Sequence, residues 1–287
     1  MADLAPGRHV SVVAPAHNEE DNIPRLVDEV GAALALTGLD FEVIIVDDGS
    51  TDGTRRAVQA LMARHEWLRC LAMARTPPGS GHGQSAAFHA GFRACRGDLI
   101  ATLDADCQND PADLPRMLEL LERAGADMVQ GDRSRNRRDS PVRRVGSAVG
   151  RAFRRGLLGD TIRDTGCSLR VMRREVALRL PLELRGMHRF IPVTARQMGC
   201  TVVEMPVSHR PRTAGETKYG MGIASRAIPG LVDCFAVRYM GARRRPVLCE
   251  VIEAIETVPA PEADALEGAD VPGPVGARPL DAPEHAR

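Results

Sequence analysis

The sequence predicts an α/β fold, with a mixed, mainly parallel sheet covered by helices on both faces. Short apolar runs rich in Val, Ile and Leu alternate with amphipathic stretches over roughly the first 130 residues. This alternation is typical of β-α-β units, which join parallel strands and place helices on both sides of the sheet. Hydrophobic residues make up 44% of the chain and charged residues 26%, as in ordinary globular proteins.

Five apolar runs are predicted to be buried strands, because they are short, rich in β-branched residues and bounded by polar or turn-forming residues. Four other stretches are predicted to be helices, because their apolar residues recur three and four positions apart. The predicted strands are His9–Ala14, Phe41–Val46, Leu68–Ala72, Asp98–Leu103 and Asp127–Val129, and the predicted helices are Asp21–Leu36, Thr51–Arg64, Gln84–Cys95 and Pro111–Ala124.

Two later segments, Val142–Leu158 and Ile223–Met240, are also predicted to be helices with one apolar side. Nine arginines lie between Arg133 and Arg155, against the single acid Asp139. A basic amphipathic helix suits an anionic membrane surface. The alternative is an ordinary solvated face on a helix that packs against the core.

Charge and cysteine usage narrow the class of protein. The 38 basic residues balance 38 acidic ones, which argues against general electrostatic binding of nucleic acid. Seven scattered cysteines without a Cys-x-x-Cys pair argue against a disulfide framework or a zinc site and are typical of the cytoplasm. There is no run of about 18 apolar residues, so no transmembrane helix is predicted.

Three acidic, turn-forming loops follow the first, second and fourth predicted strands: Pro15–Asp21, Asp47–Thr54 and Asp104–Asp110. In a parallel sheet these loops meet at the carboxyl edge of the strands, where such folds carry their chemistry. Carboxylates crowded together there repel one another, and a bound cation or ligand donors would relieve the repulsion.

Within these loops, Asp104 and Asp106 are spaced to face one hard divalent cation, with Gln108 as a neutral oxygen ligand. In the second loop, a carboxylate of Asp47 or Asp48 is able to accept hydrogen bonds from a nucleobase or a ribose. The alternative is that Asp47 or Ser50 caps the next helix. No Gly-rich dinucleotide loop and no Gly-x-x-x-x-Gly-Lys-Ser/Thr motif occurs.

The order of five segments makes the prediction specific. The sequence resembles a family 2 glycosyltransferase of the GT-A fold, and within that family the dolichol-phosphate and polyprenyl-phosphate sugar synthases of the dolichol-phosphate mannosyltransferase type. The resemblance covers about Val10 to Val237. It rests on Val12–Glu20, Ile44–Thr54, Leu103–Pro111, Asp164–Met172 and Arg212–Gly220.

The resemblance implies a GT-A domain over residues 1–222, with a nucleotide-sugar half at about 8–130 and an acceptor half at about 131–222. Residues 223–257 would form amphipathic interfacial helices. From residue 258 on, the chain contains six prolines and almost no large apolar side chain, which predicts a disordered tail over 258–287.

The activity that the resemblance implies is inverting transfer of mannose, glucose or a similar sugar. The donor would be a GDP- or UDP-sugar, the acceptor a polyprenyl or dolichyl phosphate, and the cofactor Mg²⁺ or Mn²⁺. The enzyme would lie peripherally on the inner, cytoplasmic face of the membrane. A separate membrane protein is a possible partner, and no nucleic-acid partner is expected.

Carried over to this chain, the family's motifs imply three groups of residues. The nucleotide-sugar-binding group is Pro15, His17, Glu19, Val46, Asp48, Asp104, Ala105, Asp106, Arg133 and Lys218. The metal ligands would be Asp104, Asp106 and Gln108. The catalytic group would be Asp106, Arg133, Arg212 and Lys218.

A phosphate acceptor needs no dedicated catalytic base. Its oxygen is anionic at pH 7 and attacks the anomeric carbon directly, provided that cations hold the two anionic reactants in line. His188 stands near the expected base region. It is able to serve as a base, but the sequence favours a structural role beside Arg189. The single lysine of the chain, Lys218, falls where the resembled family carries a phosphate-contacting lysine.

Three alternatives remain open at this point. A family 2 transferase of another type would act on a sugar or other hydroxyl acceptor, although the Gln-x-x-Arg-Trp motif of processive members is absent. A non-catalytic scaffold would bind nucleotide only, against which the presence of Asp104, Asp106 and Lys218 argues. A nucleotidyltransferase would carry a Gly-rich basic loop where Pro15–Asp21 is acidic.

Overall fold

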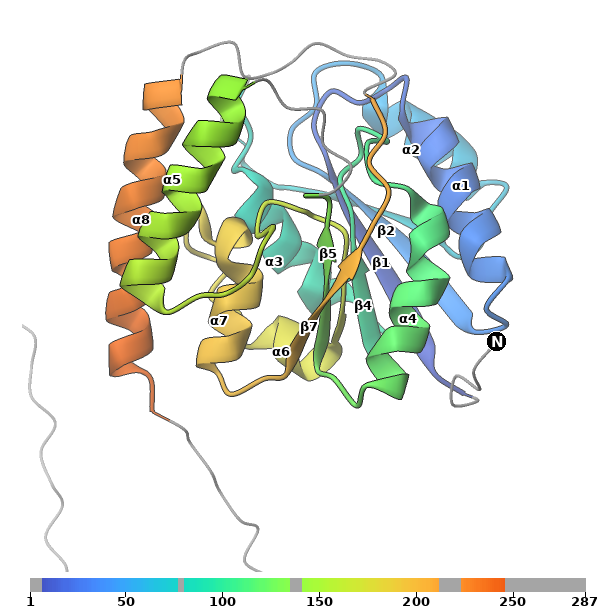
Figure 1. Cartoon of the computed structure of the whole chain (residues 1–287). Helices are drawn as coiled ribbons and strands as arrows, with labels where there is room; N and C mark the ends of the chain where they lie inside the picture. The colour runs from blue at the N-terminus through green and yellow to red at the C-terminus, as the bar shows by residue number, and fades with distance from the viewer. Residues whose placement is uncertain (1–6, 77–79, 135–140, 212–222, 246–287) are drawn as a thin grey trace, which may run out of the picture. The chain divides into compact units, whose positions relative to one another are not determined.

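The computed structural model describes residues 7–76, 80–134, 141–211 and 223–245. Within these residues seven strands form one sheet in the order β3-β2-β1-β4-β6-β5-β7 (Figure 1). The strands are β1 (His9–Ala16), β2 (Asp40–Asp47), β3 (Leu68–Ala72), β4 (Leu99–Thr102), β5 (Met128–Asp132), β6 (Arg170–Arg173) and β7 (Val202–Pro206).

One half of the sheet is parallel. Strand β1 pairs with β2 on one side and with β4 on the other, and β2 pairs with β3. The other half is mixed, because β6 runs antiparallel between β4 and β5 while β7 is parallel to β5. The carboxyl ends of β1, β2 and β4 therefore meet at one edge, as the sequence predicts.

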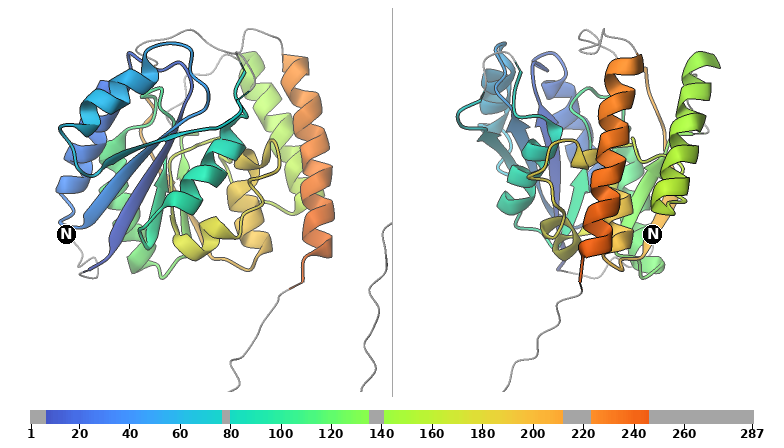
Figure 2. Two further views of the ribbon diagram at one scale, coloured as in Figure 1. Left: turned by 180° about the vertical axis from the view of Figure 1, so that it is seen from behind. Right: turned by 90° about the vertical axis from the view of Figure 1, so that its left-hand side faces the viewer.

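Helices cover both faces of the sheet, as predicted (Figures 1 and 2). Buried residues of α1, α2 and α4 form one core with the strands, and those of α3, α6, α7 and α8 form a second core on the other face. The helices are α1 (Ile23–Ala35), α2 (Thr54–Met62), α3 (Gln84–Ala94), α4 (Leu114–Arg123), α5 (Pro141–Leu158), α6 (Arg174–Leu178), α7 (Ile191–Gln197) and α8 (Ile223–Arg243), with 3-10 turns η1 (Pro111–Asp113) and η2 (Met187–Phe190).

The predicted strands are all present, with ends that shift by a few residues. The prediction of Asp127–Val129 was too short, because β5 continues to Asp132 and so brings Arg133 to the carboxyl edge. Strands β6 and β7 were not predicted. Each is short, β6 begins and ends with arginine, and β7 contains Glu204, so neither shows an apolar run. Their pairing with distant strands outweighs their local pattern.

Three predicted helices also change at their ends. The first begins at Ile23, with a proline in its first turn. The second begins at Thr54, whose N–H donates to Asp52 at 2.9 Å. The predicted helix Pro111–Ala124 divides into η1 and α4, because a proline in the first turn of α4 lacks the N–H that a continuous helix needs.

The two helices predicted to be amphipathic lie side by side as α5 and α8 (Figures 1 and 2). The ring of Phe153 on α5 meets that of Phe235 on α8 with centroids 6.0 Å apart. Arg238 donates through Nη1 to the carbonyl of Leu157 at 2.7 Å. Val237 is fully buried in the second core, so α8 is anchored to the domain on its inner side.

Residues 1–246 form one compact unit that contains both the sheet and α8. The division at residue 222 stays a prediction, and the tail predicted over 258–287 lies outside the described residues. Within the described part of the chain, no helix is both long enough and apolar enough to span a bilayer.

Helix α3 packs closely on β1 through Gly91. A methyl group at this position would lie 2.4 Å from Val13 Cγ1. Gly91→Ala is therefore expected to lower the free energy of unfolding by about 1–3 kcal/mol, measured by urea denaturation. Adding Val13→Ala should make the Gly91→Ala cost smaller, because it removes the clashing methyl groups.

The matched control is Gly156→Ala on α5. A methyl group there meets no described atom within 4 Å. The control should be neutral or stabilising by up to about 1 kcal/mol, because Ala favours a helix over Gly. Equal costs at the two positions would contradict the packing argument.

Candidate active site

The loops that follow β1 and β2 are joined through Asn18. Its N–H donates to Ser50 Oγ at 3.0 Å and its Oδ1 accepts from the Thr51 N–H at 2.7 Å. Glu19 N–H donates to Thr54 Oγ1 at 2.8 Å. Asn18 has a φ of 53°, a left-handed conformation that Asn tolerates better than most residues. Local turn chemistry therefore holds the first two loops together.

The residues predicted for the nucleoside lie at this edge. Pro15 pairs in register with Val46 across β1 and β2. His17 Nδ1 lies 2.7 Å from the carbonyl oxygen of Asp48. A carbonyl only accepts, so Nδ1 carries the proton in this contact. The backbone carbonyl of Glu19 accepts the N–H groups of residues 22 and 23, which closes the turn into α1. The structure brings these five residues together, and their contact with a nucleoside stays a prediction.

The two aspartates at the end of β2 have different tasks. Asp47 is fully buried and accepts two hydrogen bonds from Arg55, at 2.7 and 2.9 Å. Asp48 accepts from the backbone N–H groups of His82 at 2.8 Å and Gly83 at 2.7 Å. Asp47 therefore stabilises the loop, whereas Asp48 holds the chain that leads into α3.

That chain, residues 81–84, was not identified from the sequence. A methyl group on Gly81 would lie 2.5 Å from Asp48 Oδ2, and both Gly81 and Gly83 have positive φ. The next residue, Gln84, donates through Nε2 to Asp104 Oδ1 at 2.5 Å. The segment thus bridges Asp48 and Asp104. Two glycines and a glutamine after a third strand were the available signal.

Asp104 and Asp106 lie together, with Asp104 partly buried and Asp106 9% exposed. Burial raises the pKa of Asp104, and the carboxylate of Asp106 adds to the rise, while Arg133 and Arg170 oppose it. Asp106 Oδ1 accepts from the N–H of Gln108 at 3.2 Å. The repulsion predicted for this loop is present.

The donor set fits a hard divalent cation. No group of three or more His, Cys, Asp or Glu side chains suited to a metal occurs among the described residues. Mg²⁺ nevertheless keeps several waters and is commonly bound by one or two carboxylates plus substrate phosphates. Asp104 and Asp106 meet that requirement. The side chain of Ala105, between them, is buried in the core, so only its backbone is available to a ligand.

Arg133 follows β5 directly and is held by Asp164. Its Nε and Nη2 donate to the two carboxylate oxygens at 2.8 and 3.2 Å, and its backbone N–H donates to Oδ2 at 3.2 Å. Burial acts to lower the pKa of Arg133, but these bonds raise it above the ordinary value. Asp164 begins the segment Asp164–Met172, and the sequence did not indicate a role for its carboxylate.

A second guanidinium, that of Arg170 on β6, is 2% exposed. Its Nε donates to Gln130 Oε1 at 2.8 Å and its Nη2 to the carbonyl of Thr165 at 3.0 Å. Burial lowers the pKa of Arg170 to about 10, while Asp104 acts in the opposite direction. Arg170 therefore stays charged at pH 7 and offsets the nearby acids.

The chain after β7 reaches the same edge. His209 forms an antiparallel bridge with Asn109, and the N–H of Arg210 donates to the carbonyl of residue 108 at 2.9 Å. Residues 209 and 210 are thus bound to the loop after β4. Arg212 and Lys218, predicted to contact phosphates, lie outside the described residues.

Comparison with known families decides the class of the protein. Residues 11–180 match the model of the family described as glycosyl transferase family 2. The chain belongs to this family. The match begins in β1 and ends just after α6, so it contains the acidic loops, Arg133 and Asp164.

The curated relatives of this family 2 glycosyltransferase include two undecaprenyl-phosphate 4-deoxy-4-formamido-L-arabinose transferases. The protein from Klebsiella pneumoniae is 34% identical over 235 residues, which cover 82% of this chain and 69% of the relative. The protein from Edwardsiella ictaluri is 34% identical over 234 residues, covering 82% and 70%. The chain is therefore an enzyme of the glycosyltransferase class.

Solved structures show the same fold. Glucosyl-3-phosphoglycerate synthase from Mycobacterium tuberculosis, in complex with Mn²⁺, UDP and glucosyl-3-phosphoglycerate, aligns with a TM-score of 0.60 and 22% identity over 79% of this chain and 80% of that one. A mannosyltransferase from Pyrobaculum calidifontis, in complex with GDP-Man and Mn²⁺, aligns with a TM-score of 0.56 and 21% identity over 79% and 63%. The predicted GT-A fold is confirmed.

In this family 2 glycosyltransferase, His188 is bound to the start of α3. Ser85 Oγ lies 2.9 Å from Nδ1 of His188 and also accepts the His188 backbone N–H at 3.0 Å. Burial lowers the pKa of His188 to about 3, and the charges of Arg189 and Arg170 add to this. A general base needs a pKa near the working pH, so the two contacts with Ser85 together with the low pKa favour a structural role for His188.

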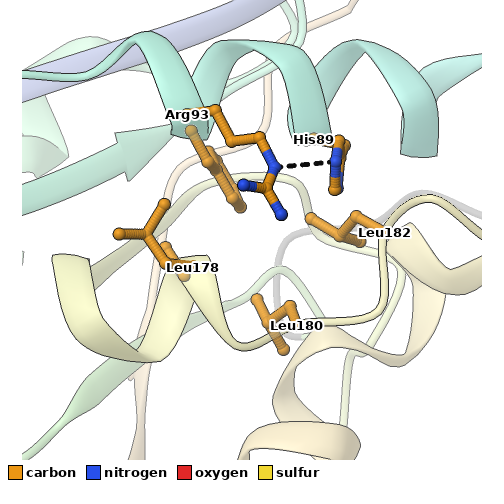
Figure 3. A pocket seen from close by; sticks show the side chains of 7 residues that line it. His89, Arg93, Leu178, Leu180 and Leu182 are labelled. Carbon is orange, nitrogen blue, oxygen red and sulfur yellow. Dashed lines mark hydrogen bonds between the residues drawn. The ribbon is translucent and has the colours of Figure 1, made fainter. Parts of the chain in front are cut away.

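A narrow hollow in the glycosyltransferase lies away from this edge, between α3 and α6 (Figure 3). Arg93 Nε donates to His89 Nε2 at 2.9 Å on one side of it. Leu178, Leu180 and Leu182 line the other side. These residues lie towards the end of α3 opposite Gln84, so the hollow is not part of the candidate site.

Proposed function

We propose that this glycosyltransferase moves a sugar from a GDP- or UDP-sugar to a polyprenyl phosphate. The observation that carries the proposal is that two acids, Asp104 and Asp106, lie near two guanidiniums at one sheet edge, those of the mostly buried Arg133 and the buried Arg170. The acids suit a cation on the donor diphosphate, and guanidiniums suit anionic oxygens. The names of the curated relatives support undecaprenyl phosphate as the class of acceptor.

On the donor side, Asp104 and Asp106 with Gln108 would hold Mg²⁺ or Mn²⁺. When bound, this cation neutralises charge on the departing nucleoside diphosphate. Gln84 orients Asp104 through its amide. The nucleoside and sugar would contact Pro15, His17, Glu19, Val46, Asp48 and the backbone of Ala105.

On the acceptor side, the task of the chain is to hold two anions close and in line. Arg133 would contact the acceptor phosphate, and Arg212 and Lys218 would neutralise phosphate oxygens of donor or acceptor. The acceptor oxygen is already anionic at pH 7, so no side chain has to remove its proton. The low pKa of His188 agrees with a reaction that lacks a base.

The test is sugar transfer from a donor panel. The enzyme is incubated with GDP- and UDP-sugars, including a nucleotide-linked 4-deoxy-4-formamido-L-arabinose, with Mn²⁺ or Mg²⁺, and with undecaprenyl phosphate or undecaprenol. We expect a lipid-linked sugar phosphate from undecaprenyl phosphate only, with loss of turnover in EDTA. Equal transfer to undecaprenol would favour the hydroxyl-acceptor alternative, and nucleotide binding without any transfer would favour the scaffold.

We further propose that the outer side of α5 and α8 binds an anionic membrane surface, where such an acceptor lies. Val232, Phe235 and Tyr239 on α8 are 61%, 56% and 64% exposed, and they recur at three- and four-residue spacing along one side of the helix. Arg151 and Arg155 are exposed on α5. Apolar and basic side chains on adjacent helices suit an interface between lipid headgroups and acyl chains.

Flotation with phosphatidylglycerol-containing vesicles measures this binding. Val232→Ser/Phe235→Ser/Tyr239→Ser should abolish most of the flotation. Arg151→Glu/Arg155→Glu should weaken it at least ~10-fold, since each arginine near an anionic surface contributes about 1 kcal/mol. Leu36→Ser is the control, because Leu36 is 67% exposed at the end of α1. Unchanged flotation of both multiple variants would contradict the proposed membrane surface.

A further inference from the structure

The proposed reaction does not use the carboxylate of Asp164, which binds Arg133 at the candidate site. The carboxylate of Asp164 accepts hydrogen bonds from Nε and Nη2 of the guanidinium in a bidentate contact, and it also accepts the Arg133 backbone N–H. The two side chains are 7% and 12% exposed. This side-on contact uses the Nε N–H and one N–H of Nη2. It leaves two N–H groups on Nη1 and one on Nη2 that face away from Asp164, and it fixes their direction.

Asp164 is itself held by hydrogen bonds from other parts of the chain. Its carbonyl accepts from Gln130 Nε2 at 3.0 Å, and its Oδ1 accepts from the N–H of Gly166 at 3.2 Å. Gln130 is bound in turn by Arg170, which also holds the carbonyl of Thr165. Because Gln130 and Arg170 lie on β5 and β6, the turn that carries Asp164 is attached to two strands of the sheet.

The same turn is attached to α5 through Arg154. Its Nη1 donates to Thr165 Oγ1 at 2.8 Å and its Nη2 to the carbonyl of Ile162 at 2.6 Å, while its Nε pairs with Asp160. Arg154 is the side chain through which α5, part of the proposed membrane surface, fastens the segment that holds Arg133. The chain of contacts runs from that helix through residues 160–165 to the guanidinium.

We propose that Asp164 is the positioning residue that directs Arg133 towards the anionic acceptor, on a turn fastened to α5 by Arg154. The inference rests on the proposed function, in which Arg133 contacts the acceptor phosphate. Without the Asp164 carboxylate, the guanidinium keeps its charge but samples several rotamers. Affinity for the phosphate should then fall, while contacts with the prenyl chain stay as they are.

The experiment is a double-mutant cycle on binding to the full chain, with farnesyl phosphate as the probe and farnesol as its uncharged match. Titration calorimetry measures both affinities for wild type, Asp164→Asn, Arg133→Ala and the double variant. We expect Asp164→Asn to lose about tenfold in farnesyl phosphate affinity, within the range for coupled neighbours. It should lose nothing further in the Arg133→Ala background, and farnesol affinity should not change.

Asp127→Asn is the matched control, because Asp127 precedes the other end of β5 and accepts the N–H of Thr201 there. It should bind both probes as wild type does. If Asp164→Asn is too unstable to measure, Asp164→Glu takes its place in the cycle, since it keeps the charge and displaces the carboxylate by one methylene group. A merely structural role would lower stability without a phosphate-selective loss.

The outcomes separate this inference from the proposed function. Wild-type affinity in Asp164→Asn, or losses that multiply with those of Arg133→Ala, would overturn the positioning role while the acceptor proposal stands. A wild type that binds farnesyl phosphate no better than farnesol, or an Arg133→Ala variant equal to wild type, would contradict the acceptor role of Arg133 and the inference with it.

Discussion

Replacing Asp104 and Asp106 together by Asn is expected to reduce sugar transfer at least ~1,000-fold. A bound cation is worth several kcal/mol of charge stabilisation on a leaving diphosphate, and each 1.36 kcal/mol corresponds to tenfold in rate. The variant should remain folded. Burial and the neighbouring Asp106 raise the pKa of Asp104, so the ionised pair costs stability at pH 7 in the absence of metal. Transfer rates and thermal melts without metal measure the two effects.

Asp98→Asn is the control for this loss, because Asp98 is exposed and precedes the same strand at the opposite edge of the sheet. It should retain wild-type transfer. The sign of the stability effect also follows from the pKa. Because folding raises the pKa of Asp104, its carboxyl costs stability once the pH rises above the ordinary pKa of an aspartate. The stability advantage of the Asn variant should therefore disappear in acid, where the carboxyl is protonated in the folded and in the unfolded chain. Metal-dependent turnover retained by the double variant would contradict the metal assignment.

Arg170→Met is expected to be the most destabilising single substitution among those considered. Removing one partner from a buried charged network costs about 3–5 kcal/mol, because the remaining charges and polar groups are left uncompensated. Here the substitution removes the hydrogen-bond donors of Gln130 Oε1 and of the Thr165 carbonyl. It also removes a positive charge that stabilises the ionised carboxylate of Asp104. The melting temperature should fall by roughly 10 °C.

Arg179→Met provides the comparison, because Arg179 is exposed just after α6. Exposed substitutions of this kind usually change stability by about 0.5 kcal/mol or less. Urea unfolding of both variants at pH 7 measures the difference. An Arg170→Met variant as stable as the control would show that the network around β6 does not depend on the buried charge.

The helices and the parallel half of the sheet were predictable because their signals are local. Apolar spacing within α1 and apolar runs in β1, β2 and β4 are properties of short segments. Strand β6 escaped prediction for the same reason: it is four residues long, begins and ends with arginine and takes its place only by pairing with β4 and β5.

The candidate site divides in the same way. Its acids were predictable, since turn-forming carboxylates follow strand after strand. The different roles of Asp47 and Asp48 were not predictable. Only the contacts of Arg55 with Asp47, and of residues 82 and 83 with Asp48, separate a stabilising acid from one that holds the entry to α3. The bond from Gln84 to Asp104 spans 20 residues and has no local pattern.

The sequence by itself determined the fold class, the edge of the sheet at which the acidic loops meet, and the family motifs with their acids and Arg133. The tertiary structure decided the partner of each charged group. Asp164 lies 31 residues from Arg133, and Arg170 lies 40 residues from Gln130, its partner on the neighbouring strand. The periodicity of a segment shows which of its side chains face the core and which face solvent. The state of a buried charge depends instead on the groups that surround it and pair with it, and these groups come from distant parts of the chain.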